Sequence, residues 1–307
     1  MTPGTTSETA PPATRDDLTR GVLLMTLAVA LLTVMDALVK HLLEGGVHLM
    51  ELLFIRSVLI GSGVWLVYSL RGSSASLLPV NRRGQAARAL FGVLAPICFF
   101  SGLALLPLTD ATVVGYASTF STVALSAWLL GERVGPLRWA GVAVGYAGVI
   151  VAIDPERAEG SLGHLLVLLA ALALSAFHVI GKRLVLTETP MSLVLCYNLA
   201  LGLLALGWLP FVWRTPTLVE GLFVVLFALL AVGGQWCLTR AFALADVSVI
   251  APLEYTSLVW VVALDAAVWN IAPEARVLAG AAIVIAACLF VFWRERLASR
   301  RALGPGG

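Results

Sequence analysis

Residues 102–152 read GLALLPLTDATVVGYASTFSTVALSAWLLGERVGPLRWAGVAVGYAGVIVA, and this stretch decides the fold. It contains one apolar run, Asp110 to Leu130, and all but the last residue of a second, Pro136 to Ile153. Each run is close to the about 20 residues that an α-helix needs to cross a bilayer core. Between them lie a Leu-Gly-Glu-Arg sequence and a Gly-Pro pair, which are typical of turns. The stretch therefore predicts two membrane-spanning helices joined by a short connection.

The same pattern extends over the rest of the chain. Ten apolar runs are separated by charged residues, glycine or proline, and we interpret each as a membrane span. The predicted spans are Leu18 to Leu43, Leu49 to Leu70, Gln85 to Leu106, Asp110 to Leu130, Pro136 to Ile153, Gly163 to Arg183, Met191 to Trp213, Val219 to Ala243, Val247 to Ile271, and Glu274 to Trp293.

Composition supports a membrane protein. Of the 307 residues, 60% are hydrophobic and only 12% are charged, whereas an average soluble domain has roughly 25% charged residues. The mean hydropathy is +0.95. So few charges could not cover the surface of a water-soluble protein of this length. The composition also excludes disordered, collagen-like and nucleic-acid-binding chains, and the net charge of +2 indicates no electrostatic attraction to a partner.

The positions of the basic residues predict the orientation of the spans. With the N-terminus in the cytoplasm, fifteen of the twenty Lys and Arg residues fall on the cytoplasmic side, four fall outside, and Arg56 lies within a span. Cytoplasmic loops carry such an excess of positive charge. We therefore expect an all-α membrane protein of ten transmembrane helices with both termini in the cytoplasm.

Two similar halves are visible when the chain is compared with itself. A shift of 142 residues places Met35-Asp36-Ala37-Leu38-Val39-Lys40 on Phe177-His178-Val179-Ile180-Gly181-Lys182, and Arg56 on Asn198. A similar shift with small indels places residues 108–114 on residues 244–250. Because each half has five spans, the halves must cross the membrane in opposite directions. Inverted five-helix repeats predict a site at their interface and alternating access around it.

The predicted organisation follows from these repeats. We expect a disordered cytoplasmic tail at 1–17, a first five-helix repeat at 18–153, an external linker at 154–162, a second five-helix repeat at 163–293, and a basic cytoplasmic tail at 294–307. The first apolar run is too long for a cleaved signal peptide, so it is interpreted as a retained spanning helix.

Three features carry a resemblance to a known family: Arg56 within LFIRSVLI, the Leu-Gly-Glu-Arg turn of residues 102–152, and the glycine-spaced helix that ends this stretch. In these features the chain resembles the drug/metabolite transporter superfamily, in particular the EamA-type ten-helix exporters. The second half departs from the family pattern because Val268-Trp269-Asn270 replaces the Gly-Glu-Arg turn. The resemblance covers nearly the whole chain after Asp17. It implies a small-metabolite exporter, most like the amino-acid-exporting group, in the bacterial cytoplasmic membrane.

Two polar residues in the first hairpin of each half are candidates for an internal site. Asp36 and Arg56 lie ten residues on either side of Gly46, so they reach matching depth and can pair. Their counterparts His178 and Asn198 lie ten residues on either side of Glu188. One interpretation is that these residues join the helices of each hairpin. The alternative is that His178 responds to protons or holds a substrate carboxylate.

Two further spans carry polar groups. In the fourth span, one helical stripe must pack against a neighbouring helix or line an aqueous cavity; it contains Thr112, Tyr116, Thr119, Thr122 and Ser126. Glu254 lies in the ninth span two residues after Pro252, and the repeat places Thr119 opposite Tyr255. A carboxylate beside a proline-interrupted helix could receive an ammonium group or a proton, or could pack as a protonated side chain.

The remaining candidates have simpler interpretations beside the functional ones. Asp265 lies on the same stripe as Glu254 but nearer the outer end, and Gln235 and Trp236 offer a hydrogen-bonding group and a stacking face. Lys40 and Lys182 are expected to extend to the membrane surface. Gly141, Gly145 and Gly148 predict close packing of the fifth helix, within the chain or between copies. The four cysteines are expected to be buried thiols without metal or disulfide roles.

The predicted function is secondary transport, with export of small polar metabolites and amino acids as the preferred substrates. The substrate-binding candidates are Tyr116, Thr119, His178, Asn198, Gln235, Trp236, Glu254 and Tyr255, with Asp36 and Arg56 as a structural or coupling pair. The alternatives are an exporter of lipophilic cationic drugs and, more remotely, a receptor or scaffold without transport. No enzyme motif, P-loop or metal motif is present in the sequence, so neither catalysis nor a cofactor is expected. The expected partners are a small-molecule substrate and the lipid bilayer.

Overall fold

The computed structural model describes residues 15–70, 77–132, 134–153, 161–244 and 247–302, and every regular element among them is helical. The elements are α1 (Arg15–Glu44), α2 (Leu49–Leu70), α3 (Arg82–Leu103), α4 (Leu108–Gly115), α5 (Ala117–Leu130), α6 (Pro136–Ile153), α7 (Ser161–Leu184), α8 (Pro190–Val212), α9 (Leu218–Leu244), α10 (Val247–Ile250), the 3-10 helix η2 (Ala251–Thr256), α11 (Ser257–Val268) and α12 (Ala275–Ala302).

Nine stretches of the described residues are long and apolar enough to cross a bilayer. They include the predicted fourth span, which the structure divides into α4 and α5 within Leu108–Leu130. The predicted ninth span is not among the nine because α10, η2 and α11 divide it into three short helices. The structure therefore confirms an all-helical membrane protein, and the tenth crossing and the orientation stay predictions.

Local sequence explains where the helices begin and end. Asn81 accepts a hydrogen bond from the Gly84 backbone N–H at 2.9 Å and so caps α3. Thr189 caps α8 in the same way through the Ser192 N–H at 3.2 Å, directly before Pro190. Gly131 ends α5 with a φ of +66°, a left-handed conformation that glycine adopts without strain.

The predicted tails need correction at their inner ends. The chain is already helical at Arg15, and α12 continues past Trp293 to Ala302, so the helix extends into the predicted basic tail although the apolar span ends at Trp293. A helix that leaves the membrane can continue in water when its residues are good helix formers, as they are in RERLASRRA. Most of the predicted first tail, residues 1–14, and most of the predicted linker at 154–162 lie outside the described residues.

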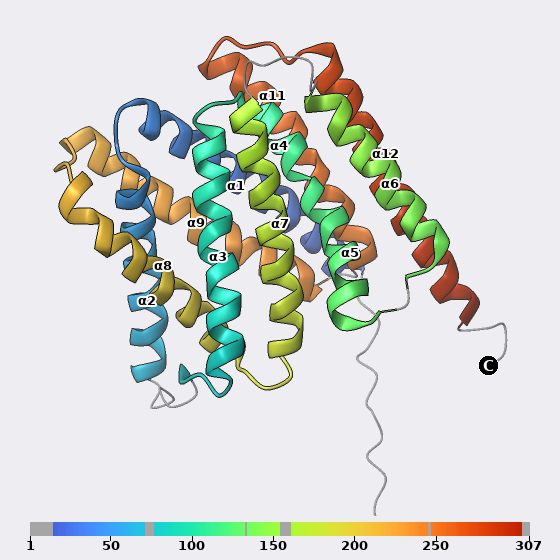
Figure 1. Ribbon diagram of the computed structural model, residues 1–307, viewed down its shortest axis with the longest axis horizontal. Coiled ribbons are helices and arrows are strands. Elements are labelled where there is room, and N and C mark those ends of the chain that lie inside the picture. Colours follow the sequence, from blue (N-terminus) through green and yellow to red (C-terminus); the bar gives the residue numbers. More distant parts are fainter. Residues whose placement is uncertain (1–14, 71–76, 133, 154–160, 245–246, 303–307) are drawn as a thin grey trace, which may run out of the picture.

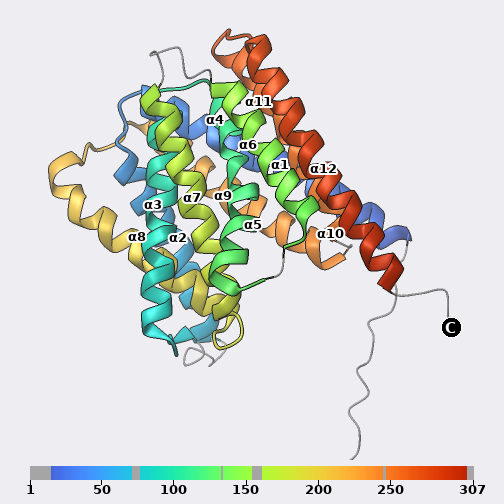
Figure 2. The same cartoon turned by 45° about the vertical axis from the view of Figure 1, so that its right-hand side comes forward.

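Equivalent helices of the two halves pack in a two-fold pattern. In Figures 1 and 2, α2 lies beside α8 and α6 lies beside α12, while α1 pairs with α9 and α3 pairs with α7. In the two halves α1 is equivalent to α7, α2 to α8, α3 to α9 and α6 to α12. Exchanging the halves therefore converts the α1–α9 pair into the α7–α3 pair and leaves the α2–α8 and α6–α12 pairs unchanged. The halves therefore relate to each other as two structural repeats.

Glycine contacts show that equivalent helices run in opposite directions. In the α2–α8 pair, a Cβ atom added at Gly61 would lie 3.9 Å from the Asn198 Cβ, and one added at Gly202 would lie 3.2 Å from the Ser57 Cβ. Residues later in α2 thus contact residues earlier in α8, so the two helices are antiparallel. The same reversal holds for α6 and α12, where Gly141 lies against Val291 and Gly148 against Gly280. The repeats are inverted, as the odd number of predicted spans per half requires.

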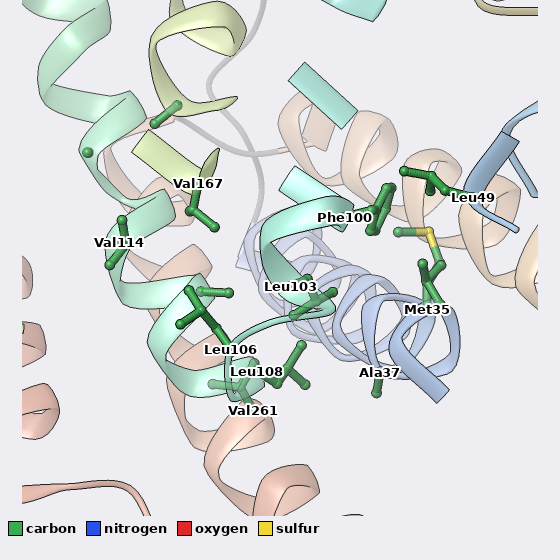
Figure 3. Packing of buried hydrophobic residues seen from close by; sticks show 14 of the residues in the cluster. Met35, Ala37, Leu49, Phe100, Leu103, Leu106, Leu108, Val114, Val167 and Val261 are labelled. Carbon is green, nitrogen blue, oxygen red and sulfur yellow. The ribbon is translucent and has the colours of Figure 1, made fainter. Parts of the chain in front are cut away.

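The apolar core is centred on the connection between α3 and α4. Figure 3 shows Leu103, Leu106 and Leu108 packed there, and their exposed fractions are 0%, 4% and 0%. The outside of the bundle is also apolar. Along α9, residues spaced by three or four positions form one exposed stripe, namely Leu222, Val225, Leu229, Val232 and Trp236. Such a stripe fits a bilayer better than water.

Candidate functional site

The interruptions in the two broken spans occur in corresponding positions of the repeats. Tyr116 separates α4 from α5, and its backbone N–H still bonds to the Thr112 carbonyl. In the other repeat, Pro252 is the second residue of η2, the tighter 3-10 turn that joins α10 to α11. Proline lacks the N–H that an α-helix needs in its interior, which explains the interruption. Broken helices at equivalent places are a frequent feature of substrate sites in inverted-repeat transporters.

The two interruptions meet each other across the repeats. The Tyr116 hydroxyl and the Ser257 hydroxyl are 2.6 Å apart. The Tyr116 and Tyr255 rings contact edge to face with centroids 5.2 Å apart. The Tyr255 hydroxyl also interacts with Thr119 and with Cys288 of α12. Three of the predicted substrate-binding residues, Tyr116, Thr119 and Tyr255, are therefore brought together.

Glu254 belongs to the same cluster. It is exposed, and it lies close enough to the Tyr116 hydroxyl to act on it electrostatically. Thr119, one helical turn after Tyr116, is exposed as well. We call Tyr116, Thr119, Glu254, Tyr255 and Ser257 the tyrosine cluster. It combines one carboxylate, four hydroxyl groups and two aromatic faces.

The predicted pair Asp36 and Arg56 also comes together, although not as a direct ion pair among the contacts of the described residues. Arg56 is the charge that acts on the half-buried Asp36 carboxyl group. The Arg56 Nε is buried without a hydrogen-bond partner. Asn198, 3% exposed, donates from Nδ2 to the Val194 carbonyl at 2.9 Å, and its Oδ1 is likewise buried without a partner. Buried polar atoms without partners are rare and are often found at functional positions.

His178 shows that α7 has two exposed faces. It is exposed, and so is Leu169 at 43%, nine residues earlier and half a turn around the helix. Leu169 lines an apolar groove of about 540 Å³ together with side chains of α3 and α5, among them Leu94 and Trp128. This apolar face belongs to the outside of the bundle. His178 lies on the opposite face of α7 from this groove.

Arg88 is a neighbour of His178 that sequence reasoning did not include in the site. Its guanidinium lies 3.8 Å from the Phe177 ring centroid and donates to the Leu193 carbonyl at 2.9 Å. It acts electrostatically on His178, and its Nε is buried without a partner. The available signal was an arginine one and a half turns inside α3, which the orientation argument counted as a cytoplasmic charge.

Gln235 and Trp236 are not part of the tyrosine cluster. Trp236 is 58% exposed on the outer apolar stripe of α9, and the Arg240 guanidinium lies 5.9 Å from its ring centroid. Gln235 is exposed beside it. Trp236 stays a predicted site residue, but the structure places it away from the tyrosine cluster, because helical periodicity alone does not show which face of an apolar helix meets lipid.

The prediction that Lys40 extends to the membrane surface was wrong. Lys40 is 4% exposed and donates to the Leu103 and Leu106 carbonyls, so the protein interior rather than the membrane surface accepts its charge. Lys182, its counterpart in the other repeat, is exposed and pairs with Glu132. Gly141 and Gly145 pack within the chain, against Val291 of α12 and Phe120 of α5.

The described residues contain no group of His, Cys, Asp and Glu that could hold a metal ion. The four cysteines are free thiols, three of them buried and Cys196 half-buried. The tyrosine cluster itself is formed by hydroxyl, aromatic and carboxylate groups, which can recognise a solute through hydrogen bonds and charge.

A bundle of inverted repeats whose broken helices meet around polar side chains is the architecture of a membrane transporter. The chain belongs to the EamA-like transporter family, whose model matches it twice, at residues 19–153 and 161–293. It is thus a member of the drug/metabolite transporter superfamily, and this family indicates a transporter rather than an enzyme.

Relatives that share about 30% of their residues carry transporter names. The "S-adenosylmethionine uptake transporter" of Rickettsia bellii is 28% identical over 204 residues, or 66% of this chain and 69% of the relative. The "Pseudopaline exporter CntI" of Pseudomonas aeruginosa is 28% identical and covers 89% of this chain and 96% of the relative. The "Riboflavin transporter" of Rhizobium johnstonii is 30% identical over 70% of this chain and 71% of the relative.

A crystal structure also resembles the chain. It covers 93% of this chain and 99% of its own chain with a TM-score of 0.59 and 22% identity. At that identity the similarity concerns the fold alone.

Proposed function

We propose that this protein is a secondary transporter that exports small polar metabolites, with amino acids as the preferred substrates, by alternating access between its inverted repeats. The observation that carries the proposal is the tyrosine cluster, where the interrupted helices of the two repeats meet and Glu254 is exposed within the predicted ninth span. A carboxylate is costly in lipid, so an exposed one at this place fits a water-accessible interior surface. The fold and the family support transport in general.

The chemistry of the cluster suits an amino acid. The Glu254 carboxylate can receive an ammonium group, and the hydroxyl groups of Tyr116, Thr119 and Tyr255 can accept or donate hydrogen bonds to polar groups of the solute. In α2, α7 and α8, the side-chain N–H groups of Arg56, His178 and Asn198 can donate to a carboxylate, and the Arg56 Nε–H is a buried donor without a partner. The Asn198 Nδ2 already donates to the Val194 carbonyl, and its unpartnered Oδ1 can accept a hydrogen bond from a solute. A solute with charges of both signs would therefore complement the two sets of side chains.

The direction and the location of transport belong to this proposal. Named relatives include both an uptake protein and an exporter, so their names do not decide the direction. The excess of Lys and Arg on one side of the predicted spans supports an N-in, C-in orientation in the bacterial cytoplasmic membrane. In that orientation the α1–α2 turn at Glu44 to Gly46 faces outward.

A second candidate function is export of lipophilic aromatic cations. The observation in its favour is the pair of tyrosine rings beside a carboxylate, because aromatic faces and a negative charge attract organic cations. Competition separates the two candidates. If aromatic cations are transported and no amino acid is, the drug assignment replaces the amino-acid assignment; if aromatic cations only inhibit amino acid flux, the amino-acid assignment holds.

The test measures uptake of radiolabelled amino acids into liposomes that contain the purified full-length protein. Glu254→Gln keeps the size of the side chain and removes its charge, and we expect uptake to fall about tenfold or more, as for the loss of one charge-assisted hydrogen bond. Glu132→Gln is the matched control, because Glu132 forms an exposed pair with Lys182 that contributes little. Wild-type uptake by Glu254→Gln would contradict the proposed site. Absence of flux for every solute in the wild type would favour a receptor or scaffold instead.

A further inference from the structure

One fully buried carboxylate connects the two repeats at the end of the bundle that holds the α1–α2 turn. Asp265 of α11 is 0% exposed. Its Oδ1 accepts a hydrogen bond from the Leu108 N–H at 3.0 Å. Its Oδ2 accepts from the Thr109 N–H at 2.7 Å and from the Thr109 hydroxyl at 2.6 Å. Leu108 and Thr109 begin α4 in the first repeat, whereas Asp265 belongs to the second.

These three hydrogen bonds satisfy groups that no nearby residue satisfies. The first N–H groups of a helix lack partners within the helix, and Pro107, the N-cap residue of α4, provides no side-chain cap. A carboxylate at a helix N-terminus is further stabilised by the helix dipole. Separating the repeats at this end would break all three bonds at once and leave both a buried carboxylate and the start of α4 without partners.

Lys40 and Trp269 reinforce the same end. Lys40 of α1 donates to the Leu103 and Leu106 carbonyls, just before α4, and its charge acts together with that of Asp265. The Lys40 ammonium also lies 5.3 Å from the Trp269 ring centroid. Trp269 in turn donates from Nε1 to a Glu44 carboxylate oxygen at 2.7 Å. Side chains of both repeats thus surround the Asp265 contact.

The opposite end of the bundle has a different residue at the equivalent position. The repeat aligns Val268-Trp269-Asn270 with Gly131-Glu132-Arg133, so Trp128 corresponds to Asp265. Trp128 is 80% exposed and carries no acceptor for a helix N-terminus. Lys182, the counterpart of the buried Lys40, has a side chain that is 63% exposed. The two ends therefore differ in sequence and not only in conformation.

We infer that Asp265 is a positioning residue of the transport cycle, which holds the α1–α2 end closed by binding the start of α4 and so favours the state that is open toward the other end. This role rests on the proposed transport function. Alternating access requires the α1–α2 end to open once per cycle, and the Asp265 contact must then break. The same residue therefore sets both the resting population and the rate of opening.

The test compares distances at this end in the wild type and in Asp265→Asn. Spin labels at Leu105→Cys and Ala272→Cys, one in each repeat, report the separation by double electron–electron resonance in full-length protein whose native cysteines are replaced. The Asn side chain keeps the shape of Asp, but its NH₂ group is a donor at the position where Asp265 Oδ2 accepts from the Thr109 N–H and the Thr109 hydroxyl. We expect a second, longer distance population, with the ratio of open to closed protein raised about tenfold or more. Glu274→Gln neutralises an exposed carboxylate at the same end and should leave the distances unchanged.

Two outcomes would overturn the inference. The first is an unchanged distance distribution with only a lower melting temperature, which would make Asp265 a structural cap. The second concerns Thr109→Val, which removes one of the three hydrogen bonds and is used if Asp265→Asn does not fold. A distance distribution of Thr109→Val identical to that of the wild type would contradict the role of Asp265. Because the distances are measured without substrate, a failure of amino acid flux leaves this test intact. Where flux is present, Asp265→Asn should change the maximal rate more than KM.

Discussion

The contact between α6 and α12 predicts a large effect from a single methyl group. A Cβ atom at Gly280 would lie 2.5 Å from the Gly148 carbonyl oxygen, 2.8 Å from the Ala152 Cβ and 2.9 Å from the Ala152 backbone nitrogen. Two of these three neighbours are backbone atoms of a regular helix, which cannot rotate away as a side chain can. Gly280→Ala therefore has to push two equivalent helices of the inverted repeats apart.

The magnitude follows from two opposing contributions. Forcing an extra carbon into a packed interface costs about 1–3 kcal/mol, whereas replacing glycine by alanine inside a helix gains up to about 1 kcal/mol. Gly207 of α8 provides the matched control, because it lies inside a helix and a Cβ atom there would have no neighbour within 4 Å. We expect Gly280→Ala to be less stable than Gly207→Ala by about 1–3 kcal/mol.

Unfolding of the purified variants in the same detergent, followed by far-ultraviolet circular dichroism, measures this difference. The wild type should lie between the two variants, with Gly207→Ala equal to it or more stable. If Gly280→Ala were as stable as Gly207→Ala, the helices would not approach as closely as the structure shows. The argument that small residues bring the repeats together would then be refuted.

Two further measurements test the contacts that join the helices. Burial opposes the ionised form of Glu188, but hydrogen bonds from the Asn81 N–H and the Ser192 hydroxyl outweigh this effect and hold the pKa of Glu188 below its usual value of 4.5. The stabilisation by ionised Glu188 is therefore complete above pH 4.5 and is lost as the pH falls through the lowered pKa. The melting temperatures of wild type and Glu188→Gln should converge in acid. A constant difference between them down to about pH 3 would contradict this. For the hydrogen bond between Tyr116 and Ser257, a double-mutant cycle with Tyr116→Phe and Ser257→Ala should give a coupling of about 1 kcal/mol in the free energy of unfolding, and additive effects would show that the contact does not join the repeats.

Much of the fold could be predicted from one sequence because the bilayer restricts the possible structures. Backbone polar groups must be satisfied within each span, so an apolar run of about 20 residues has to be helical. Turn residues such as Gly131 and Gly46 then mark the joints. The inverted arrangement followed from the internal similarity and the odd number of spans, and the antiparallel contacts of Gly61 and Gly202 confirm it.

The candidate site was predicted only in part. Proline at 252 announced an interruption, and the repeat placed Thr119 opposite Tyr255, which the structure brings together. The break at Tyr116 has no proline, but Gly115 ends α4 directly before it, and this local signal was not used in the prediction. Trp236 lies away from the tyrosine cluster and Arg88 was not predicted for the site, and both have one reason: periodicity shows that a helix has two faces but not which one meets lipid.

The chain by itself determined that this is a helical membrane protein of two similar halves, because hydrophobicity and chain length are properties of consecutive residues. Only the tertiary structure decided how distant polar groups are satisfied. Lys40 donates to the Leu103 and Leu106 carbonyls at and just after the end of α3. Asp265 accepts from the N–H groups at the start of α4, and these lie more than 150 residues from Asp265 along the chain. Such partners depend on where helices cross, and a crossing brings together residues that no pattern along the chain relates.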